Sequence, residues 1–119
     1  MFNLFRGARA AGLSMPEAIE RSQTGALTLI DVREAGEIAQ TGKAKGALHV
    51  PLAMVPLKCD PKSGCLPKGL DPAKPVGVYC ASGGRSGMAA DKLRAMGFAT
   101  VYNLGGLRDW VAAGGETER

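Results

Sequence analysis

The residues best suited to chemistry in this sequence form one short loop, Cys80-Ala81-Ser82-Gly83-Gly84-Arg85. Glycine lacks a Cβ atom, so the backbone can bend here and turn several N–H groups toward one point. Such N–H groups, together with a cation, lower the pKa of a nearby thiol, and they also hold anions such as a sulfonate or phosphate group. The pattern predicts a nucleophilic Cys80 in an anion-binding cradle. The alternative is a buried structural cysteine in a tight turn.

The segments on either side of this loop predict how it is positioned. Residues 76–79 form a short apolar run that is typical of a buried strand. Apolar residues then recur at helical spacing over residues 86–96, and Gly97 suits the end of a helix. Cys80 therefore falls between the C-terminal end of a strand and the start of a helix, where open α/β sheets bind their ligands.

The rest of the chain alternates between strand and helix patterns in the same way. Helices are expected over residues 14–23, 34–40 and 107–113, and strands over 26–30, 47–50 and 101–104. Residues 51–75 hold six prolines and predict a long surface loop. Together these patterns predict an α/β fold with an open, mainly parallel central sheet flanked by helices. We divide the chain into an N-terminal extension (1–13), one domain (14–113) and a tail that frays (114–119).

Composition restricts the class of protein. The 119 residues suit one compact domain, and 45% hydrophobic and 22% charged residues are typical of globular proteins rather than disordered chains. No run approaches the ~18 apolar residues of a membrane span, and residues 1–12 do not resemble a secretory signal. Three cysteines, an odd number, argue against a disulfide framework. We therefore expect a reducing compartment, the cytoplasm, and no membrane partner.

The formal net charge of +4 is concentrated in one segment. Residues 41–75 hold six lysines against two aspartates, and the remaining charges balance. Two interpretations stay open: a solvated lysine-rich loop, and a positive rim that attracts small anions. Nucleic acid is not expected as a partner, because aromatic residues make up only 5% of the chain and are not interleaved with the lysines.

From Tyr79 to Ser86 the sequence resembles the active-site loop of the rhodanese family. Several separate motifs in one order are more specific than any one of them alone. The resemblance covers about residues 14–113 and implies a single rhodanese-like domain. The further motifs, in the order of the family, are Ile30-Asp31-Val32-Arg33, Gly46-Ala47, Val50-Pro51-Leu52, Gly97-Phe98, residues 101–104, and Gly105-Gly106 with Trp110.

The resemblance implies a two-step sulfur transfer that needs no cofactor. The Cys80 thiolate would take the outer sulfur of thiosulfate or of a persulfide. It would then pass that sulfur to a thiophilic acceptor, which is cyanide in vitro and a thiol or a protein in cells. Arg85 would bind the sulfonate end of the sulfur donor. The hydroxyl of Ser82 or Ser86 would supply a further hydrogen bond. The thiolate and the persulfide would be stabilised by the backbone N–H groups of Ala81, Ser82, Gly83, Gly84, Arg85 and Ser86.

Loop length separates this chain from related phosphatases. Protein tyrosine phosphatases and cell-cycle dual-specificity phosphatases place five residues between cysteine and arginine, whereas four separate Cys80 from Arg85. Tyr79 also stands where those enzymes have a histidine. The resemblance implies that the smaller pocket suits a sulfane sulfur. Two rival functions stay open: a non-catalytic rhodanese-like binding or regulatory module, which typically lacks the loop cysteine, and a Cys-dependent phosphatase.

Asp31, Arg33 and His49 have less specific patterns. Asp31 and Arg33 are interpreted as structural residues near the site, although an acid/base pair is the alternative. His49 is the only histidine, so a metal site built on histidines is not expected.

Cys59 and Cys65 leave two interpretations open. They have too few partners nearby for zinc, which takes four ligands. They are either two loop thiols, or they take part in redox chemistry. In the second case one of them would resolve the Cys80 persulfide, or the pair would form a disulfide on oxidation.

Overall fold

The computed structural model describes residues 12–119, in which helices and strands alternate along the chain. The predicted extension of residues 1–13 lies outside the described residues except for Gly12 and Leu13. Leu13 is buried in the core with residues of α1 and α5. The elements are α1 (Met15–Thr24), β1 (Thr28–Asp31), α2 (Ala35–Thr41), β2 (Lys43–Ala44), β3 (Leu48–His49), η2 (Leu52–Met54), α3 (Val55–Lys58), η3 (Pro61–Ser63), β4 (Val76–Cys80), α4 (Gly84–Ala95), β5 (Val101–Gly106), α5 (Leu107–Ala112) and β6 (Thr117–Glu118).

The central sheet has four strands in the order β3-β1-β4-β5, and all three pairings are parallel. Every residue of β4 is buried, as expected for a strand with a neighbour on each side and a helical layer on each face. The predicted α/β fold with an open parallel sheet flanked by helices is therefore confirmed.

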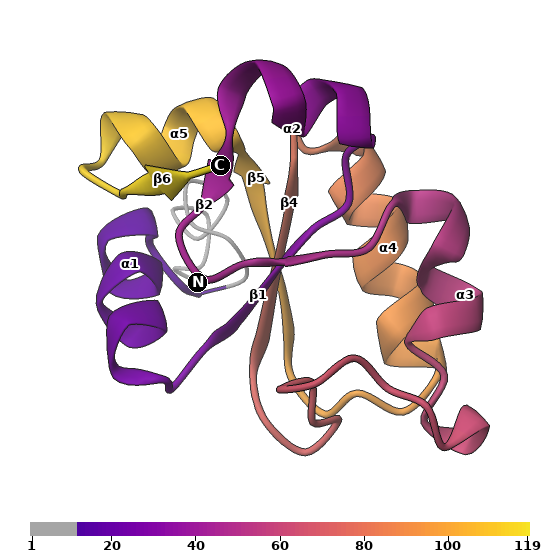
Figure 1. Ribbon diagram of the computed structural model, residues 1–119. Coiled ribbons are helices and arrows are strands. Elements are labelled where there is room, and N and C mark those ends of the chain that lie inside the picture. The colour runs from indigo at the N-terminus through magenta and orange to yellow at the C-terminus, as the bar shows by residue number, and fades with distance from the viewer. Residues whose placement is uncertain (1–11) are drawn as a thin grey trace.

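The core divides into two clusters, one on each face of the sheet. Side chains alternate between the faces along a strand, so Leu29 joins the cluster with α1 and α5, while Ile30 joins the cluster with α3 and α4. Figure 1 shows α1 and α5 on one side of the sheet, α3 and α4 on the other, and α2 beyond the end of β4. The end of β4 is thus the place where several layers meet.

The first helix starts where its sequence predicts. Ser14 Oγ accepts a hydrogen bond from the Glu17 N–H (3.2 Å), and the Glu17 carboxylate accepts one from the Ser14 N–H (2.9 Å). These reciprocal bonds satisfy two backbone donors that a helix start leaves free. The helix ends at Gly25, whose φ of 83° suits glycine.

The proline-rich segment of residues 51–75 is more ordered than the predicted loop. It contains η2, the single-turn helix α3 and η3. Pro56 and Pro61 both stand in the first turn of a helix, where the missing N–H costs no hydrogen bond. In this segment, prolines therefore stand at the start of short helices and not only in irregular loop.

The prediction of a frayed C-terminal tail is wrong. Strand β6 pairs antiparallel with β2, and the Trp110 Nε1–H donates to the Glu116 carbonyl (2.8 Å). Two lysines of the basic segment pair with acids of this tail, Lys43 with Glu118 (2.9 Å) and Lys45 with Glu116 (3.3 Å). Backbone pairing and opposite charges therefore hold a segment that has no apolar pattern of its own.

Over the part of the chain that the structure describes, no helix has the length and apolar character needed to cross a membrane.

Candidate active site

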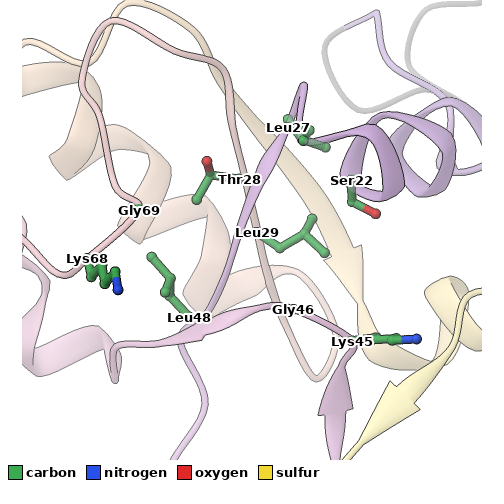
Figure 2. A pocket seen from close by; sticks show the side chains of 10 residues that line it. Ser22, Leu27, Thr28, Leu29, Lys45, Gly46, Leu48, Lys68 and Gly69 are labelled. Carbon is green, nitrogen blue, oxygen red and sulfur yellow. The ribbon is translucent and has the colours of Figure 1, made fainter.

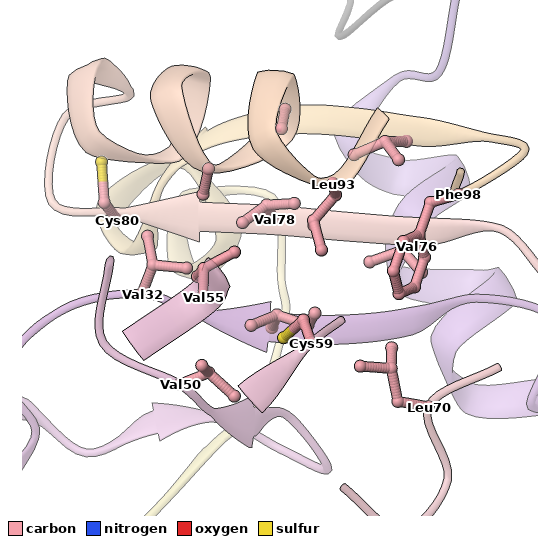
Figure 3. Packing of buried hydrophobic residues seen from close by; sticks show 14 residues of the cluster. Val32, Val50, Val55, Cys59, Leu70, Val76, Val78, Cys80, Leu93 and Phe98 are labelled. Carbon is pink, nitrogen blue, oxygen red and sulfur yellow. The ribbon is translucent and has the colours of Figure 1, made fainter. Parts of the chain in front are cut away.

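Cys80 is the last residue of the central strand, and its side chain is 1% exposed. Because Val78 and Cys80 are two residues apart, both lie on the face of the sheet that α4 covers. Figure 3 shows the Cys80 side chain pointing from the end of β4 toward the first turn of α4. The sequence-predicted nucleophile therefore lies at the C-terminal edge of the sheet, directly beneath the start of a helix.

The loop after Cys80 folds back over the sulfur. Gly83 has a φ of 105°, a left-handed conformation that glycine adopts without strain, and its N–H lies 2.9 Å from Cys80 Sγ. The Ser86 N–H and Oγ each lie 3.4 Å from the same sulfur. Helix α4 begins at Gly84, two residues before the predicted start. The sulfur is thus surrounded by uncharged donors of the loop and of the first helical turn.

These donors lower the pKa of the Cys80 thiol. Burial by itself would raise it, because a buried thiolate loses its hydration. Hydrogen bonds from the Ser86 hydroxyl and from the N–H groups of Ser86, Gly83 and Ser82 outweigh burial and bring the pKa to about 7. Ser82 contributes through its backbone only, and its side chain is exposed.

Asn103 on β5 holds this loop in place, and sequence reasoning missed it. Its Nδ2 donates to the Gly83 carbonyl (3.1 Å), and its Oδ1 accepts from the Ser86 hydroxyl (2.7 Å) and the Gly105 N–H (3.0 Å). The available signal was an amide side chain inside an otherwise apolar strand, since a buried polar group needs partners.

Gly106 lets the loop lie directly against the end of β5. A Cβ atom added at Gly106 would overlap the Ala81 carbonyl oxygen. Only glycine therefore permits this close approach of two backbone segments. The residues after Cys80 therefore pack directly against the backbone of Gly105 and Gly106.

Arg85 is bound to a carboxylate in this structure. Its Nη1 and Nη2 donate to the two carboxylate oxygens of Glu37 on α2, at 2.7 and 2.8 Å. The hydrogen bonds with Glu37 raise the pKa of Arg85 and lower that of Glu37 to about 2, so both groups stay charged. The sequence predicted that Arg85 binds the sulfonate end of the sulfur donor. It did not predict the contact with Glu37, which is 48 residues away in the chain.

Asp31 and Arg33 form a buried pair next to the site. Arg33 Nη2 lies 2.8 Å from Asp31 Oδ2, and the guanidinium also donates to Thr41 Oγ1 (2.9 Å) and the Gly42 carbonyl (2.7 Å). These bonds tie the end of β1 to the C-terminal end of α2. His49 Nε2 lies 2.7 Å from the Arg33 carbonyl oxygen and faces this same region.

The other two cysteines differ from each other. All three cysteines are free. Cys59 is fully buried in the core under α3, and burial raises its pKa to about 11, whereas Cys65 is exposed. The loop that holds Cys65 leads into the start of β4, while Cys80 ends that strand. Cys59 is thus a core residue rather than a loop thiol. Within residues 12–119, no three His, Cys, Asp or Glu side chains cluster as metal ligands would.

Two surface pockets differ in their relation to Cys80. One, of about 340 Å³, lies among the end of α1, β1, β3 and residues 68–69, and Figure 2 shows Lys45 and Lys68 on its rim. Its lining does not include the Cys80 loop. The other, of about 610 Å³, is lined by Ala81 together with Arg33, Thr41 and part of α5. The second pocket therefore lies beside the reactive loop.

Comparison with known proteins gives one family. The Rhodanese-like domain family matches residues 14–113. A protein named sulfurtransferase from Allochromatium vinosum is 35% identical over 94 residues, which is 78% of this chain and 79% of that protein. A solved structure from Rhodopseudomonas palustris, of unknown function and described as a possible tyrosine phosphatase, has a TM-score of 0.74 and 31% identity over 87% of this chain and 81% of that one. A rhodanese with anions from E. coli has a TM-score of 0.57 and 34% identity over 71% and 91%.

Proposed function

Because the chain belongs to the rhodanese-like domain family, we propose that it is a sulfurtransferase that carries sulfane sulfur as a persulfide on Cys80. The observation that carries the proposal is the environment of the Cys80 sulfur, which three donors at 2.9 to 3.4 Å surround. With a pKa of about 7, about half of the thiol is ionised at pH 7. A buried cysteine without such donors would be protonated and inert.

The proposed first step is attack of the Cys80 thiolate on the outer sulfur of the donor. With thiosulfate, the S–S bond of the donor breaks, sulfite leaves with the bonding electron pair, and Cys80 becomes a persulfide anion. With an organic persulfide, the thiolate of the organic group leaves instead. The N–H groups of Gly83 and Ser86, which contact the Cys80 sulfur, stabilise the thiolate before the attack.

The second step returns the sulfur to an acceptor. A nucleophile attacks the outer sulfur, the Cys80–sulfur bond breaks, and the Cys80 thiolate is regenerated. Cyanide leaves as thiocyanate in this step, and a thiol leaves as a persulfide. The pocket of about 610 Å³ beside Ala81 offers space for a larger thiol or for a segment of an acceptor protein. Because the reaction needs a reduced thiol, we also propose a reducing compartment such as the cytoplasm.

Intact mass tests the proposal directly. The reduced protein is mixed with excess thiosulfate, freed of donor and weighed. We expect a gain of one sulfur atom, which disappears on addition of cyanide with release of thiocyanate. Cys80→Ser should not gain sulfur, while the matched control Cys65→Ser, which loses an exposed thiol, should gain it as the original protein does.

Two outcomes would overturn the proposal. No sulfur gain with thiosulfate or with an organic persulfide would favour a binding or regulatory module. Hydrolysis of a phosphate ester that requires Cys80 would favour the phosphatase. We rank the phosphatase lower, because four residues rather than five separate Cys80 from Arg85.

A further inference from the structure

Arg85, the cation of the loop after Cys80, is already paired with a carboxylate. Arg85 and Glu37 form two parallel hydrogen bonds of 2.7 and 2.8 Å, and each side chain is only 33% exposed. Guanidinium and carboxylate match each other in such a fork, and each bond is strengthened by both charges. An anion that uses Arg85 must therefore compete with a carboxylate that is part of the fold.

The charged groups that act on Arg85 do not favour anions either. Glu34, which begins the turn before α2, is exposed and also acts on Arg85 through its charge. The hydrogen-bond donors around the Cys80 sulfur are the N–H groups of Ser82, Gly83 and Ser86 and the Ser86 hydroxyl, and all of them are uncharged. Arg85, Glu34 and Glu37 together carry a net charge of −1 before the Cys80 thiolate is counted.

We propose that Glu37 determines the donor class of this enzyme by disfavouring donors with two negative charges relative to donors with little or no charge. Thiosulfate is a dianion, whereas an organic persulfide reacts in its neutral R–S–SH form. This inference rests on the proposed sulfurtransferase function. Glu37 acts through Arg85 and through its own charge, so it is a specificity-determining residue and does not touch the reacting sulfur.

The structure offers a substitution that removes the charge and keeps the fold. Glu37 Oε1 also accepts the Glu34 N–H (2.9 Å) at the start of α2. In Glu37→Gln the side-chain amide keeps an oxygen that can accept this bond, so α2 retains its start while Arg85 loses its counter-charge. Glu20→Gln is the matched control, because it changes the net charge equally on an exposed position of α1, across the sheet from α4.

Alkylation of Cys80 measures the charge at the site without any turnover. Iodoacetate and iodoacetamide modify the same thiol, but only iodoacetate is an anion. The rates are measured by mass spectrometry on the Cys80 peptide in a Cys65→Ser background. We expect Glu37→Gln to raise the ratio of the iodoacetate to the iodoacetamide rate by about 1.5- to fivefold, the range for a partly exposed ion pair. Glu20→Gln should leave it unchanged.

The same variants are then compared with two donors. In Glu37→Gln, kcat/KM for thiosulfate should rise by about 1.5- to fivefold relative to kcat/KM for an alkyl persulfide, mainly through a lower KM. Glu37→Ala removes the charge by a second route, so it should change both ratios in the same direction even if α2 is weakened.

Separate results would overturn the two proposals. If the original protein gains sulfur normally but neither ratio changes in Glu37→Gln and Glu37→Ala, the role of Glu37 is wrong and the sulfurtransferase function stands. If the original protein gains no sulfur from any donor, the sulfurtransferase function is wrong and the donor-class role falls with it.

Discussion

Replacement of Ser86 by alanine tests the account of the Cys80 pKa most directly. Ser86 donates its N–H to the sulfur and also places its hydroxyl 3.4 Å away. Ser86→Ala removes only the hydroxyl. The loss leaves no buried acceptor unpaired, because Asn103 Oδ1 still accepts the Gly105 N–H (3.0 Å). The fold should therefore tolerate the change, and the effect should appear in the thiol.

The magnitude follows from the strength of one hydrogen bond to a charged atom. Such a bond contributes about 1.5–3 kcal/mol, and a distance of 3.4 Å to sulfur favours the low end of this range. Since one pKa unit corresponds to about 1.4 kcal/mol, the pKa of Cys80 should rise from about 7 to about 8. At pH 7 the thiolate fraction would then fall from about one half to about one tenth.

The assay is the rate of iodoacetamide alkylation of Cys80, measured between about pH 5 and about pH 10. This range includes the pKa of about 7 in the original protein and the pKa of about 8 expected in Ser86→Ala. Cys80 of Ser86→Ala should react about fivefold more slowly at pH 7. Near pH 10 the rates should be equal, because the Cys80 thiol is almost fully ionised in both proteins. Ser82→Ala is the control, because the exposed Ser82 acts through its backbone N–H, so its pH profile should not move.

An unchanged midpoint in Ser86→Ala would refute this reasoning. A hydroxyl has one proton, and Ser86 Oγ lies closer to Asn103 Oδ1 (2.7 Å) than to Cys80 Sγ. An unchanged midpoint would mean that the proton stays with Asn103, and that the backbone N–H groups alone lower the pKa of the thiol.

Three further substitutions follow from the site and the core. Asn103→Asp turns the Nδ2 donor into an oxygen that faces the Gly83 carbonyl and adds a negative charge, so the midpoint of the alkylation profile should move above pH 7. Gly106→Ala should slow sulfur transfer at least about tenfold, because the Ala81 backbone must move; an unchanged kcat/KM would contradict the close approach. Cys59→Ser should lower the free energy of unfolding by about 1–2 kcal/mol in urea titrations while the protein still gains sulfur from thiosulfate, since it places a hydroxyl in the apolar core.

Local patterns predicted the position of Cys80 and the sheet that presents it. The apolar run of residues 76–79 ends at Cys80, and the glycines after it permit a tight turn into α4. Strand order, by contrast, depends on which faces can be buried together. Boundaries moved by one or two residues, as at Gly84, because hydrogen bonds rather than hydrophobicity fix where a helix begins.

The missed residues act across long sequence separations. Glu37 and Asn103 reach the loop from α2 and β5. The apolar strand around Asn103 indicates that its amide needs partners, but nothing in the local sequence of either residue indicates which segment it contacts. The ordered structure of residues 114–119 was not predicted for a related reason. Strands β2 and β6 have two residues each and no apolar periodicity, so their pairing is visible only when residues 43–44 and 117–118 are brought together by the fold.

The position of Arg119 has a practical consequence for protein fusions. Its guanidinium donates to the Ala39 and Gln40 carbonyls (2.7 and 3.1 Å), which lie in α2, the helix that carries Glu37. A reporter joined to Arg119 without a spacer would therefore be mechanically connected to the helix beside the Cys80 loop. A Gly/Ser-rich linker would uncouple it, whereas a stiff helical linker would turn movements of α2 into movements of the reporter.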